Sequence, residues 1–176
     1  PDLRIPLHDQ LRPDTPAALD RLRAMGLNVS LLSGDNAQAV ADVARDVGLT
    51  ARAAASPADK RDAITTLQQQ GHKVLMVGDG LNDGPAPAAA DASIAPGSAS
   101  DVGRQAADLV FLGNSLLALP RSVIAARRTM RVVRQNFALA VGYNVLAVPL
   151  AIAGYVNPMI AAAAMSGSSL VVVANS

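Results

Sequence analysis

Residues 73–85 read KVLMVGDGLNDGP, and this stretch decides the fold. Four consecutive apolar residues, 74–77, run into a turn that contains three glycines and two aspartates. A short apolar run that ends at glycine is typical of a buried parallel strand, and open α/β sheets bind ligands beyond the carboxyl ends of such strands. We therefore expect Asp79 and Asp83 at a sheet edge, where two carboxylates could bind Mg²⁺ together with a phosphate. A plain Asp-Gly turn is the simpler alternative, which the second aspartate and the neighbouring Asn82 make less attractive.

Composition and charge limit the possible functions. The 176 residues carry 15 Lys and Arg against 14 Asp and Glu, so nothing indicates a nucleic-acid-binding surface. Cysteine is absent, which excludes disulfides and thiolate metal sites within these residues. The acidic residues precede residue 109, and residues 135–176 contain no charged side chain. We therefore expect a soluble α/β half followed by a membrane half.

Helical and extended patterns alternate along the first two thirds of the chain. The first 13 residues contain three prolines and neither an initiator methionine nor a signal-peptide pattern, so we expect a piece of a longer protein. Thr15 and Ser56 are the expected N-caps of two helices, each followed by a proline at the first helical position. The alternation predicts a parallel sheet with right-handed crossovers. The expected helices are 15–26, 36–48, 56–71, 85–90 and 98–106, and the expected strands are 29–32, 74–77, 92–95 and 108–112.

Two further segments have residues suited to a phosphate. Ser33, Gly34 and Asp35 follow the strand 29–32, where the serine hydroxyl and the N–H groups of the helix capped by Asn36 could bind a phosphate. Taken alone, a structural turn and helix cap explain this segment more often. Lys60 lies in the first turn of its helix, where the helix dipole disfavours a cation. It is either an ordinary surface lysine or one that reaches an anionic group.

The last third of the chain has the pattern of a membrane hairpin. A helix from Asn114 carries five arginines and leads into 137–156, twenty uncharged residues that would cover about 30 Å, the hydrocarbon thickness of a bilayer. Asn157 and Pro158 predict a turn, and residues 159–176 are a second uncharged stretch. The arginines place residues 1–135 in the cytoplasm. A buried pair of soluble helices is the alternative, which the apolar residues all round each helix disfavour.

Polar groups occur within both predicted spans. Pro149 and Gly154 interrupt the first span, which membrane helices tolerate. Polar residues at membrane depth are either packing contacts between helices or part of an ion path, and the spacing favours neither. The residues in question are Tyr143, Asn144, Met165, Ser166, Ser168 and Ser169. Met165 and Ser169 are four positions apart and share a helix face, and the Met165 thioether would suit a soft ion such as Cu(I).

Together these motifs resemble the C-terminal part of a heavy-metal P-type ATPase. The most specific match is MVGDGLND at 76–83; the family usually has Ala where Gly84 stands, Leu where Pro87 stands, and Thr where Ser33 stands. The resemblance implies a partial haloacid-dehalogenase-like parallel sheet with helices on both faces over 1–113, a basic connecting helix over 114–135 and two transmembrane helices over 136–176. It also implies a multi-pass protein of the bacterial inner membrane.

The resemblance assigns roles to individual residues. Asp79 would bind Mg²⁺, Asp83 and Asn82 would order the site, and Lys60 and Ser33 would contact the phosphoryl group transferred from ATP. Gly34 and Asp35 would complete the loop beside Ser33, and Gly78 and Gly80 would let the backbone approach the ligand. The pair Tyr143-Asn144 and the Met165–Ser169 motif resemble the corresponding motifs of monovalent-copper exporters. The overall sequence resembles the bacterial subgroup that is associated with copper delivery for respiratory-oxidase assembly. Ser168 and Ser169 would join Met165 on the transported copper.

The same resemblance indicates what these residues lack and which alternatives stay open. They contain no Asp-Lys-Thr-Gly-Thr phosphorylation motif, no nucleotide-binding insert and no Cys-Pro-Cys helix, so the chain would act only with the missing N-terminal part of the pump. A zinc or cadmium exporter would be expected to carry a charged residue in its last helices. Two other functions stay open: a membrane-anchored haloacid-dehalogenase-like phosphatase, and a membrane protein that only binds partners.

Overall fold

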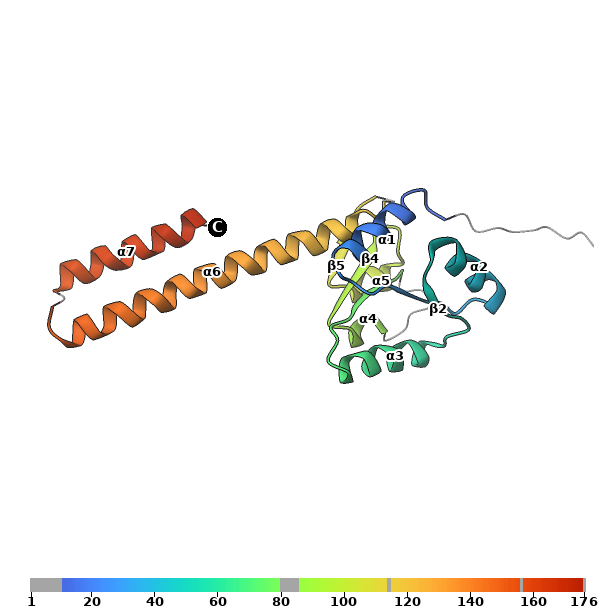
Figure 1. Ribbon diagram of the computed structural model, residues 1–176, viewed down its shortest axis with the longest axis horizontal. Coiled ribbons are helices and arrows are strands. Elements are labelled where there is room, and N and C mark those ends of the chain that lie inside the picture. Colours follow the sequence, from blue (N-terminus) through green and yellow to red (C-terminus); the bar gives the residue numbers. More distant parts are fainter. Residues whose placement is uncertain (1–10, 80–85, 114, 156, 176) are drawn as a thin grey trace, which may run out of the picture. The chain divides into compact units, whose positions relative to one another are not determined.

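The computed structural model describes residues 11–79, 86–113, 115–155 and 157–175. The chain divides into two compact units, residues 1–120 and 121–176. In the first unit, helices and strands alternate as expected (Figure 1). They are α1 (Thr15–Ala24), β1 (Ser30–Leu32), α2 (Ala37–Val47), β2 (Thr50–Arg52), α3 (Pro57–Gln69), β3 (Leu75–Val77), α4 (Ala86–Ala89), β4 (Ala92–Pro96), α5 (Asp101–Ala106) and β5 (Leu109–Phe111).

The helix starts confirm two predicted caps and correct a third. Asn36 accepts a hydrogen bond from the Ala39 N–H at 2.9 Å and so caps α2. Ser56 caps α3, as described below. The prediction that Thr15 caps α1 is wrong, because Asp14 holds the N-cap position and makes no side-chain cap bond. Its carboxylate instead accepts hydrogen bonds from the Ser115 hydroxyl at 2.7 Å and the Leu117 N–H at 3.3 Å.

Every strand pair in the described residues is parallel, as the alternation predicts. The strands form a two-stranded sheet, β1-β2, and a three-stranded sheet, β3-β4-β5. Sequence reasoning missed β2, because its residues Thr50, Ala51 and Arg52 form no apolar run and all three are exposed. The expected single sheet is therefore present as two sheets in the part of the chain that the structure describes.

The strand that carries Asp79 is less buried than its sequence predicts. Leu75 is 37% exposed and Val77 is 38% exposed. The expectation of a fully buried strand is therefore wrong for β3. The reason is that β3, within the described residues, pairs with β4 on one side only. An apolar strand with one free edge keeps part of its side-chain surface in contact with solvent.

The most buried strand of this unit is β4, where Ser93, Ile94 and Ala95 are each 3% exposed or less. Ile94 packs with Phe111 of β5 and with Leu119, a residue of the first turn of α6. Large side chains are scarce in this core, as the low aromatic content of 2% requires. The start of α6 is thus part of the same hydrophobic cluster as the central strand.

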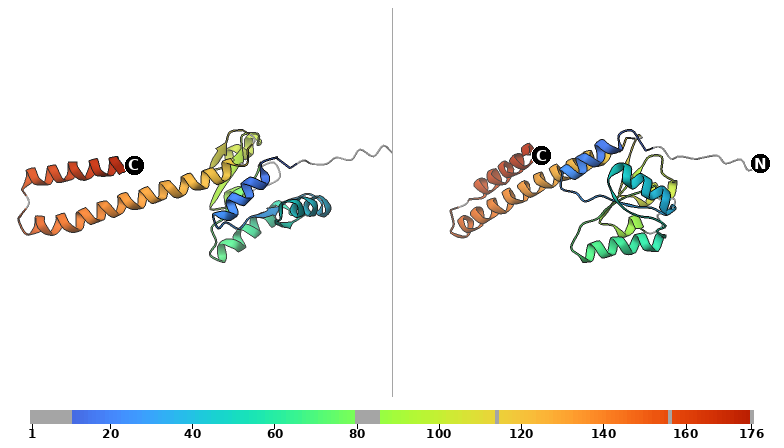
Figure 2. Two further views of the ribbon diagram at one scale, coloured as in Figure 1. Left: turned by 45° about the horizontal axis from the view of Figure 1, so that its top comes forward. Right: turned by 45° about the vertical axis from the view of Figure 1, so that its right-hand side comes forward.

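The second unit consists of the rest of α6 (Ala118–Ile152) and α7 (Pro158–Asn175), which run side by side in opposite directions (Figures 1 and 2). At the C-terminal end of α7 the Asn175 amide donates to Oδ1 of Asn136, near the middle of α6, at 2.8 Å. α6 begins at Ala118, later than the expected Asn114. It ends at Ile152, so the prediction that Gly154 interrupts the span is wrong: this glycine, at φ 78°, lies in the turn after the helix.

Length and composition make α6 a candidate membrane span. Within the described residues it is the one helix long and apolar enough to cross a bilayer. The apolar part of α7 that the structure describes, Ala162–Asn175, is shorter than the usual span. Pro149 lies inside α6, where a missing N–H is tolerated when neighbouring helices or side chains satisfy the freed carbonyl.

Candidate functional site

Ser33, Gly34 and Asp35 form a tight loop at the carboxyl end of β1. The Ser33 hydroxyl donates to Asp35 Oδ2 at 2.7 Å and accepts from the Asp35 N–H at 3.2 Å. The backbone of this loop is bonded to the segment after β2: the Ala55 N–H donates to the Ser33 carbonyl and the Ala54 N–H to the Asp35 carbonyl, each at 2.9 Å. The loop is therefore held in place before any ligand binds.

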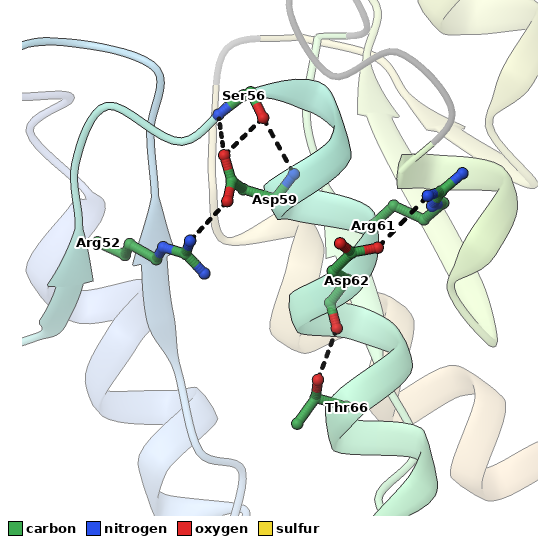
Figure 3. Close-up of polar contacts among 6 residues, drawn as sticks. All are labelled: Arg52, Ser56, Asp59, Arg61, Asp62 and Thr66. Carbon is green, nitrogen blue, oxygen red and sulfur yellow. Dashed lines mark hydrogen bonds and ion pairs between the residues drawn. The ribbon is translucent and has the colours of Figure 1, made fainter.

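The loop after β2 leads directly into α3, whose first turn carries Lys60. Ser56 and Asp59 form a capping box: the Ser56 hydroxyl accepts from the Asp59 N–H at 3.2 Å, and Asp59 Oδ2 accepts from the Ser56 N–H at 3.0 Å. Arg52 adds an ion pair to Asp59 Oδ1 at 2.7 Å (Figure 3). The hydrogen bond from Ser56, with help from Arg52, holds the pKa of Asp59 below its ordinary value.

Lys60 is buried, with only 4% of its surface exposed. Lysine is almost never this buried unless its ammonium has an anionic or polar partner, and the first turn of a helix is an unfavourable place for a cation. The alternative of an ordinary surface lysine is therefore wrong. Backbone hydrogen bonds connect the segment of Lys60 to that of Ser33. The Lys60 N–H donates to the Ser56 carbonyl at 3.0 Å, and the N–H of the preceding residue, Ala55, donates to the Ser33 carbonyl.

Asp79 follows β3 at its carboxyl end, as the sequence predicts. The Gly78 N–H donates to the Ile94 carbonyl at 3.2 Å, which extends the β3-β4 pairing up to the aspartate. The Ser100 hydroxyl, which also caps α5, donates to the Asp79 carbonyl at 3.3 Å. Both contacts fix the backbone around Asp79. The proposed role of its carboxylate as an Mg²⁺ ligand therefore rests on the chemistry of the side chain. The Gly78 N–H thus takes part in the pairing of β3 with β4.

Three of the predicted site residues, Gly80, Asn82 and Asp83, lie outside the described residues. Among the residues that are described, no three His, Cys, Asp or Glu side chains come together as a metal site. The chemistry of the donor set still fits Mg²⁺: Asp79 supplies a hard carboxylate oxygen at a strand end, and Mg²⁺ commonly uses one or two carboxylates together with waters and a phosphate.

In the second unit, Tyr143, Ser168 and Ser169 come together. They line a cavity of about 530 Å³ between α6 and α7, together with Leu139, Ala140 and three valines of α7. Met165 and Asn144 are not in its lining. The Met165 carbonyl accepts from the hydroxyls of Ser168 and Ser169, each at 3.1 Å, and its side chain is 69% exposed. The Asn144 amide donates to the Ala140 carbonyl at 3.0 Å.

Sequence reasoning did not single out three residues that shape these segments. Arg52 anchors the capping box of α3, and Ser100 contacts Asp79. Ala54 has φ 50°, a left-handed conformation that is uncommon for a residue other than glycine. No local pattern marks Ala54. Ser100 could have been found, because a serine followed by Asp101 is a usual helix start.

Comparison with known proteins agrees with this architecture. A family model for haloacid dehalogenase-like hydrolases matches residues 2–91. The chain is 52% identical to the nitrogen fixation protein FixI of Rhizobium leguminosarum bv. viciae, over 95% of the chain and 22% of that protein. It is 42% identical to the copper-exporting P-type ATPase of Staphylococcus aureus, over 97% of the chain and 21% of that protein.

A solved structure covers both units. The crystal structure of a zinc-transporting PIB-type ATPase in its E2.Pi state matches with a TM-score of 0.90 and 37% identity, over 96% of this chain and 28% of that one. The chain spans about a fifth of the length of the curated relatives named above. It belongs to the haloacid dehalogenase-like hydrolases, and within them it corresponds to the C-terminal part of a heavy-metal P-type ATPase.

Proposed function

We propose that this chain is part of a pump that uses ATP to export metal ions through an aspartyl-phosphate, with Cu(I) as the favoured cargo. The observation that carries the proposal is the pairing of two features in one chain. One is a haloacid dehalogenase-like unit with Ser33, Lys60 and Asp79 at strand ends and a helix start. The other is an apolar helix, α6, long enough to span a bilayer.

Ser33, Lys60 and Asp79 suit phosphoryl transfer. That reaction depends mostly on positioning and on neutralising the charge of the transferred group. A buried lysine keeps its charge close to a ligand in surroundings where water screens it little. The Ser33 hydroxyl can exchange its bond to Asp35 for one to a phosphoryl oxygen. Mg²⁺, when bound at Asp79, would supply further positive charge to the phosphoryl group.

The phosphorylated aspartate itself would come from a segment outside these residues. In the described part of the chain, β1 and β3 each pair on one side only, and the partly exposed side chains of β3 lack a neighbouring strand. One additional strand between β1 and β3 would join the two sheets and cover this surface. It would also bring its own carboxyl end between Ser33 and Asp79, which is where the phosphorylated side chain has to lie.

Copper is favoured over a divalent ion by the charge of the hairpin. Residues 135–176 contain no charged side chain, and residues 109–176 contain no acid. A divalent ion at membrane depth needs more compensating negative charge than a monovalent one, because desolvation of an ion rises steeply with its charge. The thioether of Met165 is a soft donor that suits Cu(I). Zinc is the second candidate, because the solved structure with a TM-score of 0.90 is that of a zinc-transporting protein.

The first experiment tests the phosphoryl site in the whole pump. Asp79→Ala should abolish labelling of the phosphoenzyme by radioactive ATP in the presence of Mg²⁺. Asp46→Ala is the matched control, since Asp46 is an exposed aspartate of α2 in the same unit. Undiminished labelling of the Asp79 variant would refute the assignment, provided that the protein is folded and binds ATP.

The second experiment tests the cargo. Met165→Ala should weaken Cu(I) binding and Cu(I)-stimulated ATP hydrolysis, while leaving the α/β unit folded. Met159→Ala removes another exposed thioether of α7, six positions before Met165, and should leave both unchanged. Equal copper stoichiometry in the Met165 variant and the parent would count against a copper site here. Stimulation by Zn²⁺ alone would favour zinc as the cargo.

A further inference from the structure

The first half of α6 carries a groove lined by arginines. The groove has a volume of about 500 Å³ and is lined by Arg127, Met130, Arg131, Arg134, Gln135 and Ala138. The other five lie 3, 4, 7, 8 and 11 positions after Arg127, so all six share one face of the helix. Three guanidinium groups thus lie beside the apolar surface of Met130 and Ala138.

Arginine is the only charged residue type in the sequence of the second unit. Residues 121–176 contain five arginines and no acidic residue. Each guanidinium offers a planar set of donors that matches the oxygens of a phosphate. The groove is therefore suited to an anion, and its apolar lining favours an anion attached to a hydrocarbon chain.

The position of the groove along α6 selects the surface of a bilayer. Arg134 is the last charged residue of the chain, and the uncharged part of the helix starts directly after it. At a rise of about 1.5 Å per residue, Arg127 to Arg134 extend over about 10 Å next to the hydrocarbon region. The polar headgroup layer of a bilayer has a thickness of the same order. The Asn175–Asn136 hydrogen bond, 2.8 Å long, places the end of α7 at this level too.

We propose that Arg127, Arg131 and Arg134 form a binding site for the headgroup phosphates of anionic phospholipids, with an acyl chain along Met130 and Ala138. This rests on the proposed function in one respect, namely that α6 spans a membrane. The site would hold α6 at a fixed depth, because the arginines bind at the headgroup layer while the uncharged part of the helix stays in the hydrocarbon.

Lipid retention measures the proposed site directly. The whole chain, purified in a mild non-ionic detergent, is mixed with equal amounts of phosphatidylglycerol and phosphatidylcholine, and the lipids that remain bound are counted by native mass spectrometry. A juxtamembrane arginine raises the affinity for an anionic surface about fivefold, so three should give a preference on the order of 100-fold for phosphatidylglycerol. High salt should reduce the preference.

The variants separate a site from general charge attraction. R127Q/R131Q/R134Q should lose the preference for phosphatidylglycerol. R21Q/R45Q/R61Q makes the same change in net charge on exposed helices of the α/β unit and should keep it. Equal preference in the groove variant and the parent would overturn the proposal, as would an equal loss in the control. A parent that retains neither lipid would also overturn it. Normal copper binding by the groove variant would leave the proposed function standing.

Discussion

Replacing Ser93 by alanine should destabilise the sheet that holds Asp79. Ser93 is 2% exposed in the middle of β4. Its hydroxyl donates to Asp108 Oδ2 at 2.9 Å and accepts from the Asp108 N–H at 3.1 Å. Its backbone N–H donates to the same carboxylate at 2.8 Å. The side chain therefore joins β4 to the start of β5 by two hydrogen bonds that alanine cannot make.

The size of the effect follows from these bonds. The bond to the carboxylate is charge-assisted and contributes about 1.5–3 kcal/mol, and loss of the second leaves the Asp108 N–H without its acceptor. Since the Ser93 N–H still binds the carboxylate in the variant, we expect a loss of about 2–3 kcal/mol in the free energy of unfolding. For a unit of this size the melting temperature should fall by about 8–12 °C.

Urea unfolding of the chain in mild detergent, followed by far-ultraviolet circular dichroism, measures this loss. Ser98→Ala is the control: Ser98 is an exposed serine two residues beyond β4, and its replacement should change stability by less than about 0.5 kcal/mol. In an Asp108→Ala background the effect of Ser93→Ala should shrink, because its partner is gone. Equal effects of Ser93→Ala and Ser98→Ala, or an undiminished effect without Asp108, would refute the reasoning.

Two further predictions concern the same unit. Hydrogen bonds from Lys73, the Val74 N–H and Gln68 hold the pKa of Asp91 well below its ordinary value. The ionised carboxylate therefore stabilises the fold above about pH 4, and this contribution is lost as the pH falls below that value. Asp91→Asn should therefore flatten the acid side of the stability profile, measured as urea midpoints between pH 7 and pH 3, and parallel profiles would contradict this. Gly48 ends α2 at φ 63°, so Gly48→Ala should lower stability by about 1 kcal/mol, whereas Gly142→Ala, where an added Cβ meets nothing within 4 Å, should not.

Much of the α/β unit was predictable because its signals are local. Asn36 and Ser56 announce the starts of α2 and α3, and both caps are present. Apolar runs between turn residues give β1, β3, β4 and β5. The parallel pairing then follows from the alternation of strands and helices.

What the sequence did not predict depends on contacts between distant segments. β2 exists because Thr50–Arg52 pairs with β1, and its own three residues have no strand pattern. Aspartate is a common helix cap, yet the carboxylate of Asp14 accepts hydrogen bonds from Ser115 and Leu117, about a hundred residues away. The hydrogen bond from Ser115 holds the pKa of Asp14 below its ordinary value. Neither partner choice can be found by examining a window of neighbouring residues.

The candidate site was predictable in part for a related reason. Residue types and motif spacing identify Ser33, Lys60 and Asp79, because each follows a local signal: a strand end, a helix cap or an apolar run. The burial of Lys60 and the bond between Ser33 and Asp35 are consequences of packing. In the hairpin, spacing put Met165 and Ser169 on one face, but the lining of the cavity shows Ser169 with Tyr143 and Ser168, without Met165.

Three departures from ordinary local rules concern segments that carry or adjoin the proposed site. Ala54 has φ 50°, which costs a residue other than glycine about 1 kcal/mol or more. Lys60 is buried in the first turn of a helix, and β3 has a partly exposed apolar surface. A sequence shaped by stability alone would place glycine at 54 and a neutral side chain at 60, since both changes remove an unfavourable term. Unfavourable choices collected around one loop pair are what the proposed phosphoryl site would require, because a cation at a helix start is costly for stability and useful for binding an anion.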